Sequence, residues 1–176
     1  MTTPYQSVRL RRVGTVARIS GFTMIVLGAV SLLFSLLHPL SAEFAVSLAL
    51  LVRGVVEWRL GSGLRAGRRV NPSRLAFNQL GLAVVVTGYS IWKIVVTTDE
   101  AVLALLNRPE VGPTLDLLDP MMRAEVIDRL PGAIRLAYLM IIPVVWLGCG
   151  GMAAYYHFKG RRGVVEADAG PTAPAS

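Results

Sequence analysis

The chain of 176 residues is 53% hydrophobic and only 16% charged, with a mean hydropathy of +0.55. Soluble domains average about 25% charged residues, and a chain this apolar lacks the polar groups that a water-facing surface needs. The composition therefore excludes an ordinary soluble domain and indicates an integral membrane protein.

The net charge of +7 and an isoelectric point near 10.3 are also typical of nucleic-acid-binding proteins. In this chain, however, the basic residues flank apolar segments, which is the pattern of cytoplasmic loops in membrane proteins. We therefore expect a lipid bilayer as the partner and no nucleic acid. The single cysteine, Cys149, rules out an intrachain disulfide.

Four segments approach the roughly 20 residues that a helix needs to cross a bilayer. They are residues 19–37, 44–60, 75–96 and 134–158. The second is the weakest, because it contains Arg53 and Glu57. The sequence predicts an all-α bundle of four transmembrane helices, with a basic leader over 1–18, a short amphipathic helical insert over 97–132 and a disordered tail over 159–176.

The first segment has an alternative interpretation as a cleaved signal peptide ending at Ala42. The leader is long, however, and the apolar region exceeds the usual 7–15 residues. Leu40 also occupies a position where signal peptidase requires a small residue. We therefore expect a retained span.

Basic and non-basic connections alternate along the chain. The leader and residues 61–74 each carry four arginines and no acid, whereas residues 38–43 carry no Lys or Arg. Residues 97–132 hold three arginines against seven acids, and the tail begins with "KGRRG". The positive-inside rule then predicts that both termini are cytoplasmic. Abundant Arg, Ala, Val and Gly favour a GC-rich bacterial genome and hence a bacterial inner membrane.

The connection 97–132 is too long for a simple turn. Thr97 and Glu100 have capping-box spacing, which predicts one short helix. Asp119 as N-cap and Pro120 at the first helical position predict a second. Its apolar stripe would comprise Leu118, Met122, Val126 and Leu130. We expect both helices to lie on the outer membrane surface or over the bundle; a docking site for an extracytoplasmic partner is the alternative.

The charged pair in the second segment is the main candidate site. Arg53 and Glu57 are four residues apart, so they share a helix face and can pair, with Arg53 reaching toward the headgroups. Asn78 and Gln79 lie at a matching depth in the antiparallel third segment. These four residues predict one intramembrane polar cluster. It either fixes the packing of the helix hairpin, which we favour, or forms a proton or ion site.

Small residues recur every seven positions, which predicts close helix packing. The positions are Gly14, Gly21, Gly28 and Ser35 in the first segment, and Gly81 and Gly88 in the third. Pro143 predicts a kink in the fourth segment. The aromatic residues near segment ends predict interfacial belts; they are Trp58, Trp92, Tyr155 and Tyr156.

The sequence carries no recognisable catalytic, cofactor-binding or metal-binding motif. His38 and His157 belong to opposite membrane faces in the predicted topology, so they cannot share a metal. We expect no cofactor and, as function, a non-enzymatic structural, accessory or regulatory subunit. The alternative is a small transporter or channel component that uses the polar cluster. The partner would be a second copy of the chain or another membrane protein; a membrane-bound enzyme has the least support.

Overall fold

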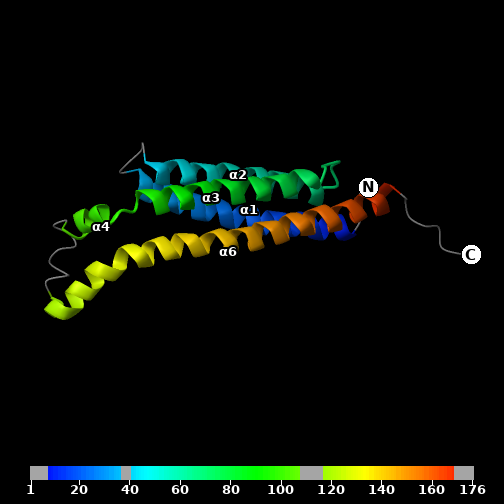
Figure 1. The fold of residues 1–176 in the computed structure, drawn as a ribbon. Coiled ribbons are helices and arrows are strands. Elements are labelled where there is room, and N and C mark those ends of the chain that lie inside the picture. Colours follow the sequence, from blue (N-terminus) through cyan, green and yellow to red (C-terminus); the bar gives the residue numbers. More distant parts are fainter. Residues whose placement is uncertain (1–7, 37–40, 108–116, 169–176) are drawn as a thin grey trace, which may run out of the picture. The chain divides into compact units, whose positions relative to one another are not determined.

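The structure is a computed structural model that describes residues 8–36, 41–107 and 117–168, apart from the Glu166 side chain. All regular elements in these ranges are helices (Figure 1). They are α1 (Val8–Ser35), α2 (Ala42–Arg65), α3 (Ser73–Val96), α4 (Asp99–Leu106) and α6 (Pro120–Asp168). Among them, α1, α3 and α6 contain segments that are long and apolar enough to cross a membrane. Helix α2 is not among them, because any segment of it long enough to cross contains Arg53, Glu57 and Arg59, so three helices rather than the predicted four qualify.

Several predicted boundaries need correction. Helix α1 begins at Val8, well inside the predicted leader. Helix α6 begins at the predicted Pro120 and is continuous over 49 residues, so the second predicted short helix is not separate from the last span but forms its first part. Pro131 and Pro143 both lie inside it, because a proline removes a single backbone bond that a long helix can spare. The predicted disordered tail is wrong for 159–168; residues 169–176 lie outside the described residues.

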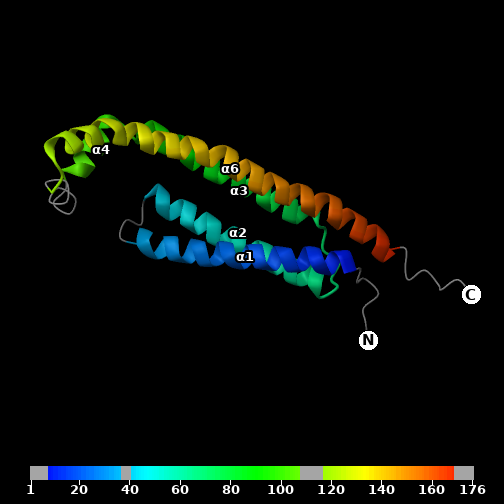
Figure 2. The ribbon, with the colours of Figure 1, turned by 90° about the horizontal axis from the view of Figure 1, so that it is seen from below.

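The chain divides into two compact units, and the first comprises residues 1–85 and 146–176. Within this unit α1 and α2 run side by side, as Figure 2 shows. They are antiparallel, since Gly14 faces Gly61 while Gly28 faces Leu51. A Cβ at Gly21 would lie 2.6 Å from the backbone nitrogen of Trp58. The glycines of α1 therefore allow the two helix backbones to touch.

Serines continue this α1–α2 contact beyond the last glycine. The Ser31 and Ser47 hydroxyl oxygens are 2.6 Å apart and share a hydrogen bond. The Ser35 hydroxyl donates back to the Ser31 carbonyl oxygen at 2.9 Å. The contact between α1 and α2 thus extends along most of both helices, with small residues throughout.

The apolar core of the first unit draws on α1, α2, α3 and α6. Its buried members are Leu10, Val13, Ala17, Leu64, Leu75, Ala76, Ala153 and Tyr156. At the same end Gly160 of α6 meets the ring of Pro72, which precedes α3. A side chain at Gly160 would overlap that ring, so glycine lets α6 approach the α2–α3 connection.

These contacts gather the basic ends of four helices at one end of the first unit. Gly14 against Gly61 brings the start of α1 to the end of α2, and Gly160 against Pro72 brings the end of α6 to the start of α3. The arginines grouped in this way are Arg9, Arg11, Arg12, Arg65, Arg68, Arg69, Arg74, Arg161 and Arg162. Charges that are dispersed in the sequence therefore lie at one end of the first unit.

The second unit comprises residues 86–145, and its core lies beneath α4. Val102 and Leu106 are buried there. The residues packed against them are Leu118, Ile127, Leu130 and Ile134. The predicted apolar stripe is therefore half wrong, since Met122 and Val126 are exposed. Because α6 continues past Pro131, its buried face follows positions 127, 130 and 134 instead.

Helix α4 forms where the sequence predicts a short helix, but its N-cap is Thr98 and not Thr97. The Thr98 hydroxyl accepts a hydrogen bond from the Ala101 amide at 3.1 Å. Arg135 of α6 holds the same turn, because its Nε donates to the Thr97 carbonyl oxygen at 2.8 Å. Its Nη2 also pairs with Asp99 at 2.9 Å, in an exposed ion pair.

Thr98→Ala should loosen α4. Loss of an N-cap oxygen costs about 1 kcal/mol, and α4 has only 8 residues to share that loss. We expect faster amide hydrogen exchange in α4, measured by mass spectrometry, with unchanged exchange in α1. Thr98→Ser, which keeps the hydroxyl, is the control; equal acceleration in both variants would show that the cap does not hold the helix.

Candidate functional site: a buried glutamate network

The four polar residues predicted from the sequence lie together in the first unit, between α2 and α3. The Glu57 side chain is 0% exposed, Gln79 is 1% exposed and Asn78 is 7% exposed. Helical phase places them there, because Glu57 lies on the side of α2 that is opposite its exposed apolar residues. The site is therefore inside the helix bundle and not at its surface.

Three side chains donate hydrogen bonds to the Glu57 carboxyl group. Gln79 Nε2 lies 2.8 Å from Oε1 and 2.7 Å from Oε2. Asn78 Nδ2 donates to Oε2 at 3.3 Å, and the Tyr156 hydroxyl donates to Oε1 at 2.7 Å. All three donors are neutral groups. Burial of a carboxyl group is tolerable only when its oxygens are hydrogen-bonded in this way.

Arg53 does not pair with Glu57, contrary to the expectation from their spacing. Within the described residues it forms no ion pair with that carboxyl group. Its Nη1 donates instead to the backbone carbonyl oxygen of Asn78 at 2.9 Å, and Asn78 Nδ2 donates to the Arg53 carbonyl oxygen at 3.2 Å. Asn78 thereby connects Arg53 to Glu57.

Gly81 explains where the Arg53 guanidinium lies. A Cβ at Gly81 would overlap the guanidinium group, so the missing side chain provides its space on α3. The predicted reach of Arg53 toward the headgroups is therefore replaced by a contact across the α2–α3 interface. A backbone carbonyl is a strong acceptor for a cation that is held away from water.

Helix α1 touches the network through Ser20. Gln79 Nε2 lies 3.5 Å from the Ser20 hydroxyl oxygen, at the limit of a hydrogen bond. With Tyr156 on α6, the network therefore draws on all four helices of the first unit.

Tyr156 belongs to the network although the sequence analysis does not place it there. It was expected in an interfacial aromatic belt, but its side chain is 0% exposed. A buried tyrosine hydroxyl requires a hydrogen-bond partner, and Glu57 supplies it. The sequence signal that could have placed it there is its depth in the membrane. Tyr156 lies near the basic end of α6, as Glu57 lies near the basic end of α2.

The predicted packing glycines fall into three groups. Gly21 and Gly28 lie against the α2 backbone, while Gly81 lies against the Arg53 side chain. At Gly88, no described atom apart from the adjoining residues and backbone of its own helix lies within 4 Å of the position that a Cβ would take, so its heptad spacing marks no contact with another helix there. Spacing alone cannot distinguish a packed glycine from an exposed one.

The network's geometry limits what it can do. The described residues hold no group of acidic, His and Cys side chains suited to a metal ion. Four cavities on the described part of the first unit are lined by none of the four cluster residues. The arrangement can hold α2, α3 and α6 against one another through hydrogen bonds, with α1 in contact through Ser20. Comparison of the chain with protein-family models, with curated proteins and with solved structures gave no match.

Proposed function

We propose that this chain is a four-span protein of a bacterial inner membrane, with both termini in the cytoplasm, and that it acts without catalysis as a structural, accessory or regulatory subunit. The observation that carries the proposal is the closed network on Glu57, in which α3 and α6 satisfy a buried carboxyl group of α2. Such a network stabilises one arrangement of helices.

The surface of α2 supports the proposal that it too crosses the membrane, which together with α1, α3 and α6 makes four spans. Leu48, Val52 and Val56 are exposed and four residues apart, so they form an apolar stripe suited to lipid. Glu57 points away from that stripe into the bundle. Glu57, one of the charged residues that distinguish α2 from the other long helices, is therefore held away from lipid. Its 24 residues cover about 36 Å, enough for a hydrocarbon core of about 30 Å.

The grouping of basic helix ends supports the proposed orientation. The arginines at the start of α1, between α2 and α3, and at the end of α6 lie at one end of the first unit. The positive-inside rule places such an end in the cytoplasm. An even number of spans is then needed to keep both termini on that side.

In this proposal the network holds the helices together through hydrogen bonds. Hydrogen bonds between membrane helices contribute about 0.6–2 kcal/mol each, so several around one carboxyl group hold the bundle appreciably. Close backbone contact between α1 and α2 adds packing that does not depend on water. A rigid, small bundle of this kind suits a subunit that supports or regulates a membrane partner.

A proton or cation transporter component is the second candidate. The observation in its favour is that only neutral side chains bond the Glu57 carboxyl group. Ionisable groups inside membranes commonly take part in proton transfer. Four helices enclose little aqueous path, so this function would also require several copies of the chain.

Glu57→Gln separates the two candidates. The purified chain is reconstituted in liposomes with a pH-sensitive dye, and a pH gradient is imposed; the exposed Glu100→Gln variant is the control. The structural proposal predicts no proton flux above that of empty liposomes, together with a lowered unfolding temperature for Glu57→Gln alone. A flux that the native chain and Glu100→Gln support and Glu57→Gln abolishes would establish transport instead.

A further inference from the structure

Two adjoining cavities lie between α3 and α6 at the basic end of the first unit. One has a volume of about 620 Å³ and is lined partly by the α2–α3 connection. The other, of about 410 Å³, lies along the two helices. Ser73 and His157 line both cavities, so the two adjoin each other, and together they are called the depression below.

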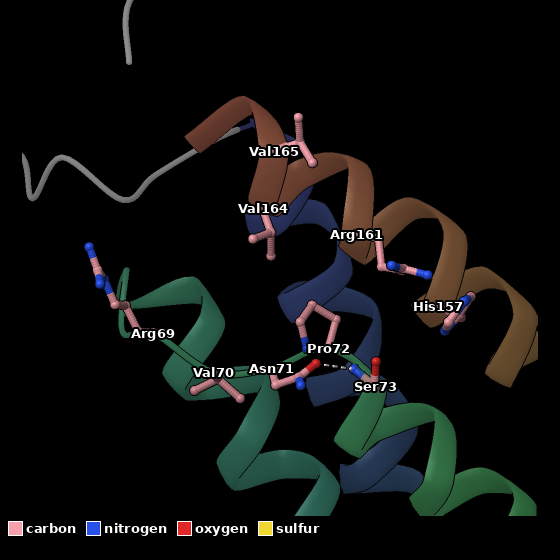
Figure 3. Close-up of a pocket in the computed structure, with 9 residues that line it drawn as sticks. All are labelled: Arg69, Val70, Asn71, Pro72, Ser73, His157, Arg161, Val164 and Val165. Atoms are coloured by element: carbon pink, nitrogen blue, oxygen red, sulfur yellow. Dashed lines mark hydrogen bonds between the residues drawn. The ribbon is translucent and has the colours of Figure 1, made fainter. Parts of the chain in front are cut away.

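The first cavity is basic. Arg69 and Arg161 line it together with His157 and the side chains of Asn71 and Ser73. Among the described side chains, which do not include that of Glu166, no acidic one lines it. Figure 3 shows His157 and Arg161 on neighbouring turns of α6, with Pro72 and Ser73 across from them and Arg69 at the far rim. Asn71 is held in place, because its Oδ1 accepts a hydrogen bond from the Ser73 amide at 2.9 Å.

The second cavity is apolar. Its walls include Ala76, Phe77 and Leu80 of α3 and Gly150, Ala154 and Phe158 of α6. None of the described residues that line it is Asp, Glu, Lys or Arg. The small residues on α6 leave a groove, and the exposed rings of Phe77 and Phe158 border it. Gly150 has no described atom within 4 Å of the position where a Cβ would lie.

We propose that this depression binds one anionic phospholipid, with the phosphate group in the basic cavity and an acyl chain in the apolar groove. A free anion would match only the basic cavity, and a lipid without net charge would gain little from the arginines. Basic pockets between membrane helices are suited to acidic headgroups. The inference rests on the proposed membrane location and is independent of what Glu57 does.

The test uses the full chain in neutral detergent. Native mass spectrometry measures the binding of phosphatidylglycerol and of phosphatidylcholine, which carries no net charge. We expect one preferentially bound phosphatidylglycerol, and Arg161→Gln should weaken its binding about fivefold. Arg162→Gln removes the same charge from the neighbouring exposed position, which lines neither cavity, and should have a much smaller effect.

The groove has its own matched pair of variants. Gly150→Leu fills the apolar cavity and should weaken binding of long-chain phosphatidylglycerol. Gly148→Leu makes the same change on α6 at a position that does not line the groove and is equally open, and should leave binding unchanged.

Three results would overturn the proposal: equal binding of the two lipids, equal effects of Arg161→Gln and Arg162→Gln, or displacement of the lipid by inorganic phosphate. The first would show that headgroup charge does not select the lipid, the second would indicate general attraction to a basic surface, and the third would indicate a site for a free anion. Failure of the proposed membrane location would appear separately, as recovery of the chain in the soluble fraction without detergent.

Discussion

Gly21→Ala is expected to destabilise the bundle by about 1–3 kcal/mol, although it adds a single methyl group. The new Cβ would lie 2.6 Å from the Trp58 nitrogen and 2.8 Å from the Gly54 carbonyl oxygen. Both are backbone atoms, so α1 and α2 must move apart to accept it. Thermal or denaturant unfolding in a fixed detergent, followed by circular dichroism, measures the change.

Gly88→Ala is the matched control for this prediction. The same methyl group at Gly88 meets no described atom within 4 Å, so only the helix propensity changes. Alanine is favoured over glycine in a helix by about 0.5–1 kcal/mol, so this variant should be as stable as the native chain or more so. Equal losses in both variants would mean that α1 and α2 do not touch as the structure shows.

Gln79→Leu is expected to lower the free energy of unfolding by about 1.5–3 kcal/mol, because it removes the donor that bonds both oxygens of a buried carboxyl group. Asn78 and Tyr156 remain, but neither is placed to replace two hydrogen bonds. The leucine side chain adds no further destabilisation, since it is apolar and of similar size. Unfolding in the same detergent gives the free-energy change.

A double-mutant cycle shows whether the loss in free energy of unfolding arises from the interaction between Glu57 and Gln79. Glu57→Leu alone leaves the three donors without their acceptor, and Gln79→Leu alone leaves the acceptor without its main donor. Glu57→Leu with Gln79→Leu removes both, so its cost should be less than the sum of the single costs. A coupling energy of about 0.5–3 kcal/mol is expected for partners in one network. Additive costs would show that the two side chains do not interact.

The sequence located most of the polar network because depth in a membrane can be counted along a helix. Glu57 and Asn78 were expected at the same level of antiparallel helices, and they are hydrogen-bonded. What counting cannot provide is side-chain direction. The sequence allowed the Arg53 guanidinium to pair with Glu57 or to reach toward the headgroups. It lies instead in the space beside Gly81, and that space exists only once α3 is packed against α2.

The sequence did not predict the long-range partner of Glu57 or the continuity of α6, and each omission has a physical reason. The Tyr156 contact to Glu57 joins residues 99 positions apart, and no local pattern encodes such a pair. Pro131 followed by glycine resembles a helix end, yet the apolar residues on either side keep α6 continuous. Gly88 shows the converse, since its spacing matches a packing seam although no described atom lies against it.

If α2 crosses the membrane and carries Glu57 inside the bundle, the two ends of α2 must lie on opposite sides of the bilayer. Ala42→Cys and Ala66→Cys, each combined with Cys149→Ser, mark the start and the C-cap of α2. A membrane-impermeant maleimide applied to intact cells should label Ala42→Cys, and should label Ala66→Cys only after the membrane is permeabilised. Labelling of both positions from the same side would place α2 on one face of the membrane and contradict this topology.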